Sequence, residues 1–597
     1  MKSLNLATVN DVFVRASSRG DKTAMLWQDP GGVWKPITSD ELYGRVRALA
    51  EVLSSWGVQR GDRVALISEN RWEWPVTDFA AMALGAVDVP LFPTLTPEQV
   101  GYMLRDSGSK VVVVSSAKQY KKVVEAGDLP ALEHIVVMDE GEFEGADSFS
   151  ALMAKAGEYQ ARDAAFDAQV ASVRPEELST IIYTSGTTGD PKGVMLTQGN
   201  FAANLSISTS PFDFTEQDSC ISFLPLSHVT ARHVDYVLLA RAVTLAYCPR
   251  LEGLAPAMQT VKPTIFVGVP RVYEKLRQTV ESRSRRSPVK KRIFQWALSV
   301  GKAHRKAILK GKTPWAPGWK LANKLVFSKI QEAFGGRVQV YVAGGAPLGM
   351  DTGGWFADVG IRILEGYGLT ETSPVIGLNY PKAYKFGTIG QPLANVQCRF
   401  AEDGELEVKG PSIFRGYWNK PQETAEAFSE DGWFRTGDIG NLDADGFISI
   451  TDRKKELLKT SNGKLVAPQP IENRLKANGL VAQAALVGDK RKYVSVLISP
   501  NLAELAEWAK DQGISSTDPK ALVKDEKVVK LYKSIVDQVN GTLAPYEAMR
   551  RITIVPDEWS IEDGTLTPSM KLKRRIVEKR YATEIGEFYR DEVTVKA

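Results

Sequence analysis

The stretch TIIYTSGTTGDPKGV, which spans residues 180–194, contains a short β-branched run followed by a loop rich in glycine and hydroxyl side chains. The run Thr180–Tyr183 predicts a buried strand, and the carboxyl end of such a strand is where α/β proteins present ligand-binding loops. Glycines let the backbone wrap closely around an oxyanion, hydroxyls donate hydrogen bonds, and a lysine adds positive charge. These features predict a phosphate-binding loop made of Thr184, Ser185, Gly186, Thr187, Thr188, Gly189 and Lys192.

This loop differs from the Walker pattern, in which Gly-Lys is followed by Ser or Thr. Here Pro191 directly precedes Lys192, and Gly193 follows it. A Gly/Ser/Thr cluster alone is typical of a surface turn, so the lysine is what favours a phosphate role. We expect the loop to hold the β- and γ-phosphates of a nucleotide.

Short β-branched runs alternate with helical patterns through the first two thirds of the chain. One helical pattern covers Glu41–Trp56. The alternation predicts an α/β fold in which parallel sheets are covered by helices on both faces. The runs that predict buried strands are Arg63–Ser68, Lys110–Val114, His134–Met138, Thr180–Tyr183 and Val338–Val342.

The pattern changes after about residue 400. Gly404–Gly410 and Gly446–Thr451 predict antiparallel strands of a small β-subdomain, whereas Pro470–Lys476 predicts a helix and Ala484–Ser499 a hairpin. A chain of 597 residues exceeds what one core normally holds. We therefore expect a large N-terminal domain over residues 1–452 and a smaller, mobile α+β C-terminal domain over residues 453–597, joined by a hinge at Asp452–Lys455.

The composition is that of a globular protein, with 43% apolar and 24% charged residues. No apolar stretch approaches the roughly 20 residues of a membrane-spanning helix, and the first residues lack the apolar core of a signal peptide. Cys220, Cys248 and Cys398 are few and far apart, which argues against a disulfide framework and a zinc cluster. These observations predict a cytoplasmic location.

Positive charge is concentrated in one part of the chain. Between residues 281 and 330 there are fourteen Lys or Arg and a single Glu, a local net charge of +13 in a chain whose total is +4. The asymmetry favours an anionic surface as a partner, although a solvated helical face explains it equally well. Trp296, Trp315, Trp319 and Phe327 among the cations favour the inner face of a membrane over nucleic acid. No nucleic-acid-binding signature is present, so no nucleic-acid partner is expected.

Further motifs follow the glycine-rich loop in a definite order. A histidine motif, a glycine segment, an acidic turn, an aspartate motif, a charged turn and a basic motif succeed one another: Phe223–His228 (FLPLSH), Val342–Leu348 (VAGGAPL), Glu365–Thr372 (EGYGLTET), Gly432–Asp438 (GWFRTGD), Asp452–Glu456 (DRKKE) and Thr567–Arg574 (TPSMKLKR). This ordered set resembles the adenylate-forming (AMP-binding) superfamily, which includes acyl-CoA synthetases, luciferases and peptide-synthetase adenylation domains.

The resemblance implies an ATP site and a role for each motif. It implies that Tyr367 stacks on adenine, that Thr370 bonds the α-phosphate, and that Glu371 coordinates Mg²⁺. The last role is physically reasonable, because a carboxylate beside a triphosphate is unfavourable unless a divalent cation lies between them. Asp438 and Arg453 are implied at the ribose. Other implied ATP-site residues are Gly344, Gly345, Ala346, Glu365, Gly366 and Gly368, the glycine segment also contacting the acyl group.

The basic motif implies that Lys571 is the catalytic lysine. Met570 stands before it where many members have Gly, and Lys573 is the fallback. Its implied role is electrostatic, because a cation beside the attacked α-phosphate stabilises charge that develops in the transition state. Lys455 is implied as the pivot of the mobile domain.

His228 is implied beside the acyl site, as a positional residue and a contributor to the CoA step, with a wall role nearly as plausible. Some long-chain members have an aromatic gate residue just after this histidine, but Thr230, Ala231 and Arg232 follow here. The remaining implied substrate or hinge positions are Gly268 and Gly463.

Thr460–Asn473 and the basic insertion at about 281–336 resemble long-chain fatty acyl-CoA synthetases in particular. That resemblance implies activation of a long-chain fatty acid by Mg·ATP to an acyl-adenylate with release of pyrophosphate, and then transfer to CoA. Two alternatives stay open: a fatty acyl-adenylate ligase that delivers to a carrier protein, and a catalytically silent membrane- or nucleic-acid-binding protein on the same fold. Chain length and oligomeric state stay open too, a homodimer included.

Overall fold

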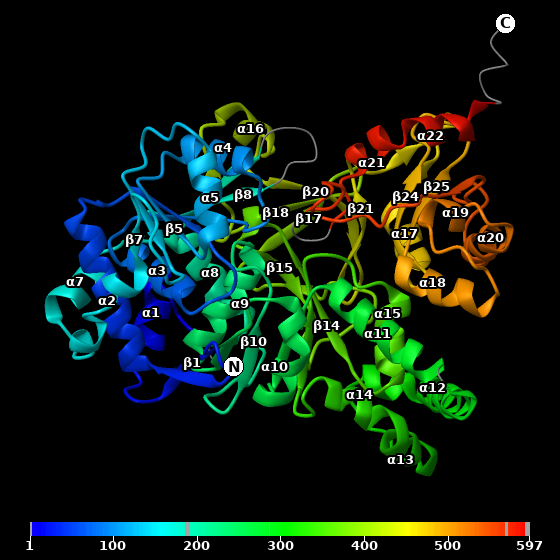
Figure 1. Cartoon of the computed structure of the whole chain (residues 1–597), viewed down its shortest axis with the longest axis horizontal. Helices are drawn as coiled ribbons and strands as arrows, with labels where there is room; N and C mark the ends of the chain where they lie inside the picture. Colours follow the sequence, from blue (N-terminus) through cyan, green and yellow to red (C-terminus); the bar gives the residue numbers. More distant parts are fainter. Residues whose placement is uncertain (1–2, 185–190, 286, 568–570, 591–597) are drawn as a thin grey trace, which may run out of the picture.

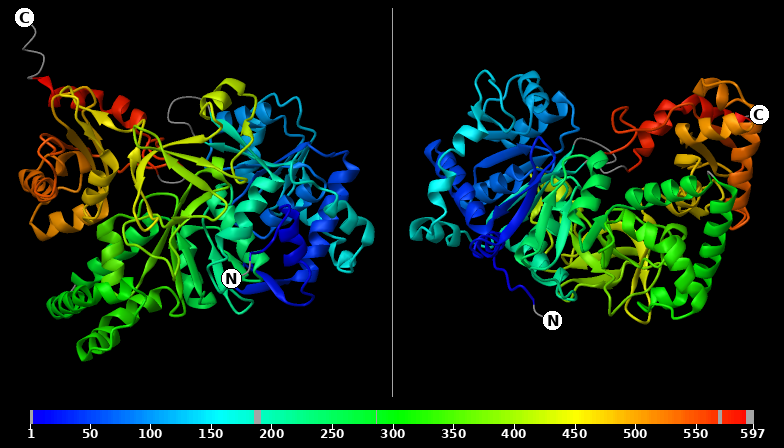
Figure 2. Two further views of the ribbon diagram at one scale, coloured as in Figure 1. Left: turned by 180° about the vertical axis from the view of Figure 1, so that it is seen from behind. Right: turned by 60° about the horizontal axis from the view of Figure 1, so that its bottom comes forward.

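The computed structural model describes residues 3–184, 191–285, 287–567 and 571–590, and is shown in Figure 1. Two large sheets form the N-terminal domain, and a smaller domain with its own sheet lies beside it (Figure 1, Figure 2). Among the described residues, none of the helices combines the length and apolar content that crossing a bilayer would require.

The first large sheet has the strand order β19-β9-β8-β4-β3-β5-β6-β7. Its central pairs are parallel, whereas β8–β9 and β9–β19 are antiparallel. Every residue of β5 is buried, as expected of a strand covered by helices on both faces. The strands are β3 (Arg63–Ile67), β4 (Val87–Leu91), β5 (Val111–Val114), β6 (His134–Val137), β7 (Asp147–Ser148), β8 (Leu178–Thr184), β9 (Lys192–Thr197) and β19 (Gly416–Tyr417).

The second large sheet has the order β16-β15-β14-β13-β12-β10-β11-β1-β2. It is parallel from β14 to β1 and antiparallel at both edges. The strands are β1 (Thr23–Gln28), β2 (Trp34–Thr38), β10 (Ser219–Ser222), β11 (Thr244–Tyr247), β12 (Ile265–Gly268), β13 (Val340–Ala343), β14 (Ile363–Gly368), β15 (Val375–Leu378) and β16 (Gln391–Pro392).

Helices connect and cover these sheets. Helix α2 begins after Thr38, whose side chain accepts a hydrogen bond from the backbone N–H of Glu41 while the Glu41 carboxylate accepts one from Thr38, a complete capping box. One hydrophobic core includes residues of both sheets and of the helices between them. Helices of this region are α1 (Asn10–Ala16), α2 (Ser39–Ser55), α3 (Glu73–Ala83), α4 (Pro97–Ser107), α5 (Ala117–Glu125), α7 (Ala164–Ala171), α8 (Gln198–Ser208), α9 (Val229–Ala240), α10 (Leu254–Val261) and α15 (Met350–Asp358).

The strands and the helix expected from the sequence are confirmed to within two residues at each end. Two expectations were too simple. The sheets are mixed rather than wholly parallel, because hairpins and returning strands add antiparallel edges. In addition, β6 and β13 are only partly buried.

The expected β-subdomain is confirmed as a four-stranded antiparallel sheet of order β17-β18-β20-β21. Its strands are β17 (Gln397–Phe400), β18 (Glu405–Lys409), β20 (Phe434–Leu442) and β21 (Ile448–Arg453). Strand β21 ends at the position of the expected hinge, so this small sheet leads directly into the C-terminal domain.

The C-terminal domain has a three-stranded sheet and two hydrophobic clusters of its own. The expected hairpin is β24 paired antiparallel with β25, to which β26 adds a parallel edge. The elements are β22 (Leu458–Lys459), β23 (Leu465–Val466), α17 (Pro468–Lys476), β24 (Val481–Val487), β25 (Ser495–Pro500), α18 (Leu502–Asp511), α20 (Glu526–Asn540), β26 (Ile552–Ile554), α21 (Arg574–Arg580) and α22 (Ala582–Phe588).

The basic insertion is helical and projects from one edge of the N-terminal domain (Figure 1). It follows α11 (Pro270–Arg285) and consists of α12 (Pro288–Leu309), α13 (Pro317–Ala322), a π-helical segment η3 (Asn323–Phe327) and α14 (Ser328–Ala333). Trp319, Ala322 and Phe327 turn inward and pack with the body of the domain.

Candidate functional site

The glycine-rich loop connects the antiparallel strands β8 and β9, and Thr184 pairs with Lys192 where it leaves and re-enters the sheet. The two strands that flank the loop are therefore the arms of a β-hairpin. Thr184 and Lys192 are described, with the Thr184 Oγ1 hydroxyl donating to the Lys192 carbonyl at 3.5 Å. Ser185, Gly186, Thr187, Thr188 and Gly189 lie outside the described residues, so their role stays a prediction.

Lys192, Tyr417 and Glu371 form a chain of contacts beside the loop. The Lys192 ammonium lies 4.9 Å from the centre of the Tyr417 ring, and the Tyr417 hydroxyl donates to Glu371 Oε1 at 2.9 Å. Burial and the charge of Glu371 raise the pKa of Tyr417, so the phenol keeps its proton. Strand β19 carries Tyr417 and pairs with β9, which explains why a residue more than 200 positions away meets Lys192.

A second group of contacts surrounds Asp438, which is only 3% exposed. Arg453 Nε donates to Asp438 Oδ1 at 3.0 Å, and the Tyr367 hydroxyl donates to the other carboxylate oxygen. Asp438 pairs with Arg453 in the register of β20 and β21, so the antiparallel ladder itself sets this ion pair. The predicted ribose and adenine residues therefore lie together.

Lys571 joins these groups from the C-terminal domain. Lys571 is exposed, yet partial desolvation of its ammonium group, together with the charge of Arg453, lowers its pKa. Asp438, Glu456 and Glu371 act in the opposite direction. The catalytic-lysine candidate of the small domain is thus brought to the carboxylates of the large one.

The described backbone on either side of residues 568–570 pairs as the two arms of a hairpin. Lys571 N–H donates to Thr567 Oγ1 at 3.0 Å, and Thr567 N–H donates to the Lys571 carbonyl at 2.8 Å. Met570 lies outside the described residues. The backbone N–H of Lys573, the fallback, donates to the Thr565 carbonyl in the strand-like continuation of this hairpin.

His228 caps the amino end of α9 and feels the charge of Lys571. Its Nδ1 accepts a hydrogen bond from Thr230 N–H at 3.2 Å, so the neutral ring carries its proton on Nε2. Burial and the positive charge of Lys571 lower the pKa of His228 to about 4. The ring is therefore neutral near pH 7. A neutral ring suits a positional role better than the role of a proton donor.

The glycine positions lie at the carboxyl ends of three neighbouring parallel strands, β12, β13 and β14. Gly344 N–H donates to the Gly268 carbonyl at 3.2 Å. A Cβ atom at Gly368 would lie within 2 Å of the Pro374 carbonyl oxygen, so only glycine fits there. This edge brings together Gly268, Gly344, Gly345, Ala346, Glu365, Gly366 and Gly368.

Glu365 is the carboxylate of this edge. Its Oε2 accepts a hydrogen bond from Leu348 N–H at 3.4 Å, and burial raises its pKa to about 7. Burial therefore favours the protonated form of this carboxyl group, which can donate a hydrogen bond as well as accept one.

Thr370 stands in the short 3-10 turn η4 (Thr370–Thr372), directly before Glu371. The turn follows β14, so Thr370 lies between the glycine edge and the Lys192–Tyr417–Glu371 contacts. Its position is compatible with the α-phosphate role that the resemblance implies.

The expected hinge residues lie at the end of β21. Asp452 is buried, its Oδ1 accepts from Arg453 N–H at 2.6 Å, and burial raises its pKa to about 7. Lys455 is exposed. Gly463 lies in the turn between β22 and β23 with a φ of +78°, and among the described residues nothing approaches within 4 Å of a Cβ built there. The structure does not bring Gly463 to the contacts around Lys192, Asp438 and Lys571.

The sequence did not predict that Arg232 has a structural role. This residue occupies the region where some long-chain relatives place a gate, yet it is completely buried and ion-paired with both Asp78 and Asp88. Its guanidinium also donates to Thr180 Oγ1 at 2.8 Å. Arg232 therefore ties α9, which His228 caps, to β8, which carries the phosphate loop. The sequence signal was weak, because charged residues at these positions equally suit exposed sites.

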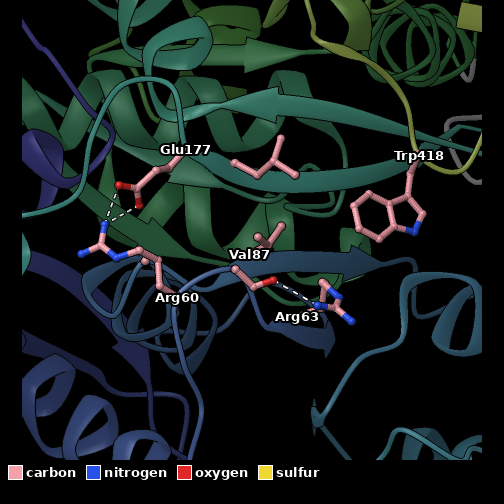
Figure 3. A pocket seen from close by; sticks show the side chains of 8 residues that line it. Arg60, Arg63, Val87, Glu177 and Trp418 are labelled. Carbon is pink, nitrogen blue, oxygen red and sulfur yellow. Dashed lines mark hydrogen bonds and ion pairs between the residues drawn. The ribbon is translucent and has the colours of Figure 1, made fainter. Parts of the chain in front are cut away.

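Two cavities lie away from these clusters. One of about 170 Å³ lies at the amino ends of β3, β4 and β8, where Arg60 pairs with Glu177 and Trp418 forms a wall (Figure 3). Arg63, at its edge, donates to the Ser107, Gly61 and Gly108 carbonyls. Its arginines thus already have partners within the fold.

The residues present fit a magnesium ion held together with a substrate. Among the described residues no three His, Cys, Asp or Glu side chains gather into a cluster that could hold a metal by themselves. Glu371 nevertheless offers a carboxylate of which one oxygen accepts from Tyr417. Mg²⁺ is commonly held by one or two carboxylates plus substrate phosphates, so a single carboxylate beside the phosphate loop suffices.

Most of the chain matches known protein families. Residues 12–418 match the AMP-binding enzyme family, and residues 455–593 match the AMP-binding enzyme C-terminal domain. The chain belongs to the AMP-binding enzyme family. The adenylate-forming resemblance drawn from the ordered motifs is thereby confirmed, as is the large-plus-small domain fold.

Named relatives of this AMP-binding enzyme cover nearly all of it. The long-chain-fatty-acid–CoA ligase FadD15 of Mycobacterium bovis is 37% identical over 574 residues, covering 94% of this chain and 93% of the relative. The long-chain-fatty-acid–CoA ligase ACSBG2 of Xenopus laevis is 30% identical, covering 99% and 84%.

Solved structures share the fold of this AMP-binding enzyme. The adenylation domain of a carboxylate reductase from Mycobacterium chelonae superposes with a TM-score of 0.75 at 23% identity, covering 98% of this chain and 92% of that one. ATP-bound MatB from Rhodopseudomonas palustris gives a TM-score of 0.69 at 25% identity, covering 96% and 99%.

Proposed function

We propose that this AMP-binding enzyme is a long-chain fatty acid–CoA ligase that forms AMP. The observation that carries the proposal is that the charge of Lys571, from the C-terminal domain, interacts with the charges of Glu371 and Asp438 and acts on His228, all of the N-terminal domain. Relatives at 30–37% identity that carry this activity in their names support the choice of substrate.

In the first step a carboxylate oxygen of the fatty acid attacks the α-phosphorus of ATP. The bond between the α-phosphorus and the bridging oxygen breaks, and pyrophosphate leaves. Lys192 and its loop hold the leaving phosphates, while Lys571 stabilises the charge that builds up at the α-phosphate. The attacking carboxylate is already ionised at neutral pH, so this step needs no general base. The lowered pKa of His228 also makes this histidine a weak base.

Four further residues position the nucleotide. Asp438 and Arg453 receive the ribose, Tyr367 lies against adenine, and Thr370 bonds the α-phosphate. Glu371 would hold Mg²⁺, which would supply positive charge to the phosphates. Tyr417, absent from the sequence-based set, orients Glu371 through its hydroxyl and lies against the Lys192 ammonium.

In the second step the thiol of CoA attacks the acyl carbon, and AMP leaves with the pair of electrons of the broken anhydride bond. Lys571 occupies the region that the second nucleophile must reach, so the C-terminal domain rotates about Lys455 between the steps. Withdrawal of Lys571 also removes one of the two causes that lower the pKa of His228. His228 then becomes a better proton acceptor for the thiol.

The proposal is tested by following both products with purified protein, palmitate, Mg·ATP and free CoA. We expect palmitoyl-CoA and AMP in equal amounts, with pyrophosphate release that depends on the fatty acid. Accumulation of acyl-adenylate without thioester would instead support the alternative of a ligase that serves a carrier protein. Absence of any fatty-acid-dependent pyrophosphate release would support the silent binding protein. A series of fatty acids of different length then identifies the preferred substrate.

A further inference from the structure

The outer surface of the basic insertion exposes large apolar side chains that a folded core would normally hide. Trp315 is 84% exposed, Val289 65% and Leu321 50%; Leu325, Ile293 and Trp296 are each about 40% exposed. We call these six residues, with the neighbouring cations Lys290, Lys291, Arg292, Lys320 and Lys324, the α12–α13 surface. Figures 1 and 2 show α12 and α13 projecting beyond the body of the domain.

Helix α12 has two apolar faces, of which only one packs on the domain. Phe294, Ala297, Gly301 and Ile308 are buried, and Arg305 fixes this side by pairing with Asp358 at 2.6 Å. Val289, Ile293, Trp296 and Val300 follow a spacing of four, three and four residues, which aligns them in a second stripe along the helix. The first three of these side chains are exposed, so the second stripe faces solvent for most of its length.

The stripe continues onto the neighbouring segment. A Cβ atom at Gly318 of α13 would lie 4.0 Å from Val300, so α13 begins where the exposed part of the α12 stripe ends. Along α13 and η3, Trp319, Ala322 and Phe327 are buried, whereas Leu321 and Leu325 are exposed. The Lys320 ammonium lies 3.9 Å from the Trp315 ring, which places a cation directly on the most exposed aromatic side chain.

The cations of this surface are free to meet an external anion. Lys290, Lys291, Arg292, Lys320 and Lys324 are exposed, and within the described part of the chain none of them has a carboxylate partner. Glu281 is the only acid among residues 281–330, and it already pairs with Arg277 at 3.0 Å. Nothing within the insertion therefore neutralises them.

We propose that the α12–α13 surface docks the protein onto an anionic phospholipid bilayer. Tryptophan and aliphatic side chains would enter the headgroup region, and lysine and arginine would lie at the lipid phosphates, the pairing that interfacial amphipathic helices use. The inference rests on this surface alone and does not depend on the proposed ligase activity.

Two other occupants fit less well. A two-fold dimer would place the same patch against itself, and unpaired cations of one copy would then face those of the other. A nucleic acid would use the cations but has no use for Val289, Ile293 and Leu321, because base stacking needs aromatic rings rather than aliphatic chains. A lipid surface uses both sets of side chains.

Co-sedimentation of the full chain with vesicles tests the proposal. We expect binding to vesicles of phosphatidylcholine with about one third phosphatidylglycerol, and at least tenfold weaker binding to pure phosphatidylcholine vesicles. The combined variant Lys290→Gln, Lys291→Gln and Arg292→Gln should bind anionic vesicles roughly 100-fold more weakly, since each cation near such a surface is worth about fivefold.

An apolar variant and a matched control complete the design. Trp296→Ser with Trp315→Ser should also weaken binding to anionic vesicles at least tenfold, because the cations alone would give only loose surface attraction. Removing three exposed lysines elsewhere (Lys510→Gln, Lys524→Gln and Lys533→Gln) makes the same change of net charge on the C-terminal domain, and should leave binding within about twofold.

Several results would overturn the proposal. Wild-type protein that stays in the supernatant with anionic vesicles would do so, as would equal loss of binding in the control variant. Binding that tolerates the two tryptophan changes and is matched by soluble heparin would indicate a polyanion site instead. A dimer in sedimentation equilibrium that the tryptophan variant dissociates would indicate self-association. Unchanged circular dichroism and thermal midpoint verify that each variant is folded.

Discussion

Two clusters in this molecule place cations against carboxylates, one sealed in the core and one open at the junction of the domains. Arg232, Asp78 and Asp88 have side chains 0–1% exposed, and Arg232 is ion-paired with both carboxylates. Lys571 keeps accessible surface, and the carboxylates that act on it also serve Arg453 and Tyr417. The comparison separates charges that hold elements of the fold together from charges arranged to receive a ligand.

The difference has a structural cause. The members of the sealed cluster come from α9 and α3, which share one hydrophobic core, and from β4, whose apolar side chains form a neighbouring core of the same domain. The members of the open cluster come from two domains, each with a core of its own. A cluster of the second kind is complete only when the two domains are close to each other.

The largest effect is expected from breaking the sealed cluster. Arg232→Met should destabilise the protein by about 3–5 kcal/mol, because it leaves two buried carboxylates without a partner. The triple variant that adds Asp78→Asn and Asp88→Asn should recover much of this loss. Urea unfolding, followed by tryptophan fluorescence, measures both. A loss below about 1 kcal/mol in the single variant would contradict the structural role assigned to Arg232.

Removing the lysine of the open cluster should affect rate rather than stability. Lys571→Ala is expected to slow fatty-acid-dependent pyrophosphate release on the order of 100- to 1,000-fold, the usual cost of losing one preorganised transition-state contact. Its thermal midpoint should stay close to that of the wild type. Lys573→Ala is the matched control, and a larger effect there than in Lys571→Ala would transfer the catalytic role to Lys573.

A smaller effect is expected from the Tyr417 hydroxyl. Tyr417→Phe removes the hydrogen bond to Glu371 but keeps the ring beside Lys192, and should slow adenylate formation about tenfold, as for other hydrogen bonds to charged groups. Tyr120→Phe deletes a comparable hydroxyl, one that donates to the Glu144 carbonyl at 2.6 Å, and should leave the rate unchanged. Equal rates for Tyr417→Phe and wild type would show that Glu371 needs no such support.

The smallest expected effect is on the pKa of His228, for which His233 serves as the reference. Burial lowers the pKa of His233 to about 3, and burial plus the charge of Lys571 lowers that of His228 to about 4. In Lys571→Ala the pKa of His228 should rise but remain below 6.5, because burial persists, whereas His233 should not change. Titration of the imidazole carbon-bound protons by NMR measures both. An unchanged His228 would mean that Lys571 does not approach it in solution.

The same shifts set a pH dependence of stability. A histidine whose folded pKa is lowered binds fewer protons in the folded than in the unfolded chain between the two pKa values. Stability is therefore lost as the pH falls from 6.5 towards 4 for His228 and towards 3 for His233. His228→Asn should reduce this slope between pH 6.5 and 4.

The sequence alone predicted the elements that local chemistry controls. Runs such as Lys110–Val114 favour buried strands wherever they occur, and β5 follows that pattern. The ordered motifs identified the candidates for the site, because glycines, hydroxyls and single charges at defined spacings serve one ligand chemistry. Asp438 and Arg453, which were both expected at the ribose, are paired in the register of β20 and β21.

Only the tertiary structure decided which distant residues meet. Tyr417 reaches Glu371 because β19 adds to the edge of a sheet built mainly from the first 200 residues. Arg232 lies in the core because its ion-pair partners, Asp78 of α3 and Asp88 of β4, are buried there. The charge of Lys571 acts on His228 although the two residues belong to different domains. Local sequence encodes strand and helix preference within a few residues, whereas the pairing of charges across hundreds of positions depends on packing, which no single segment determines.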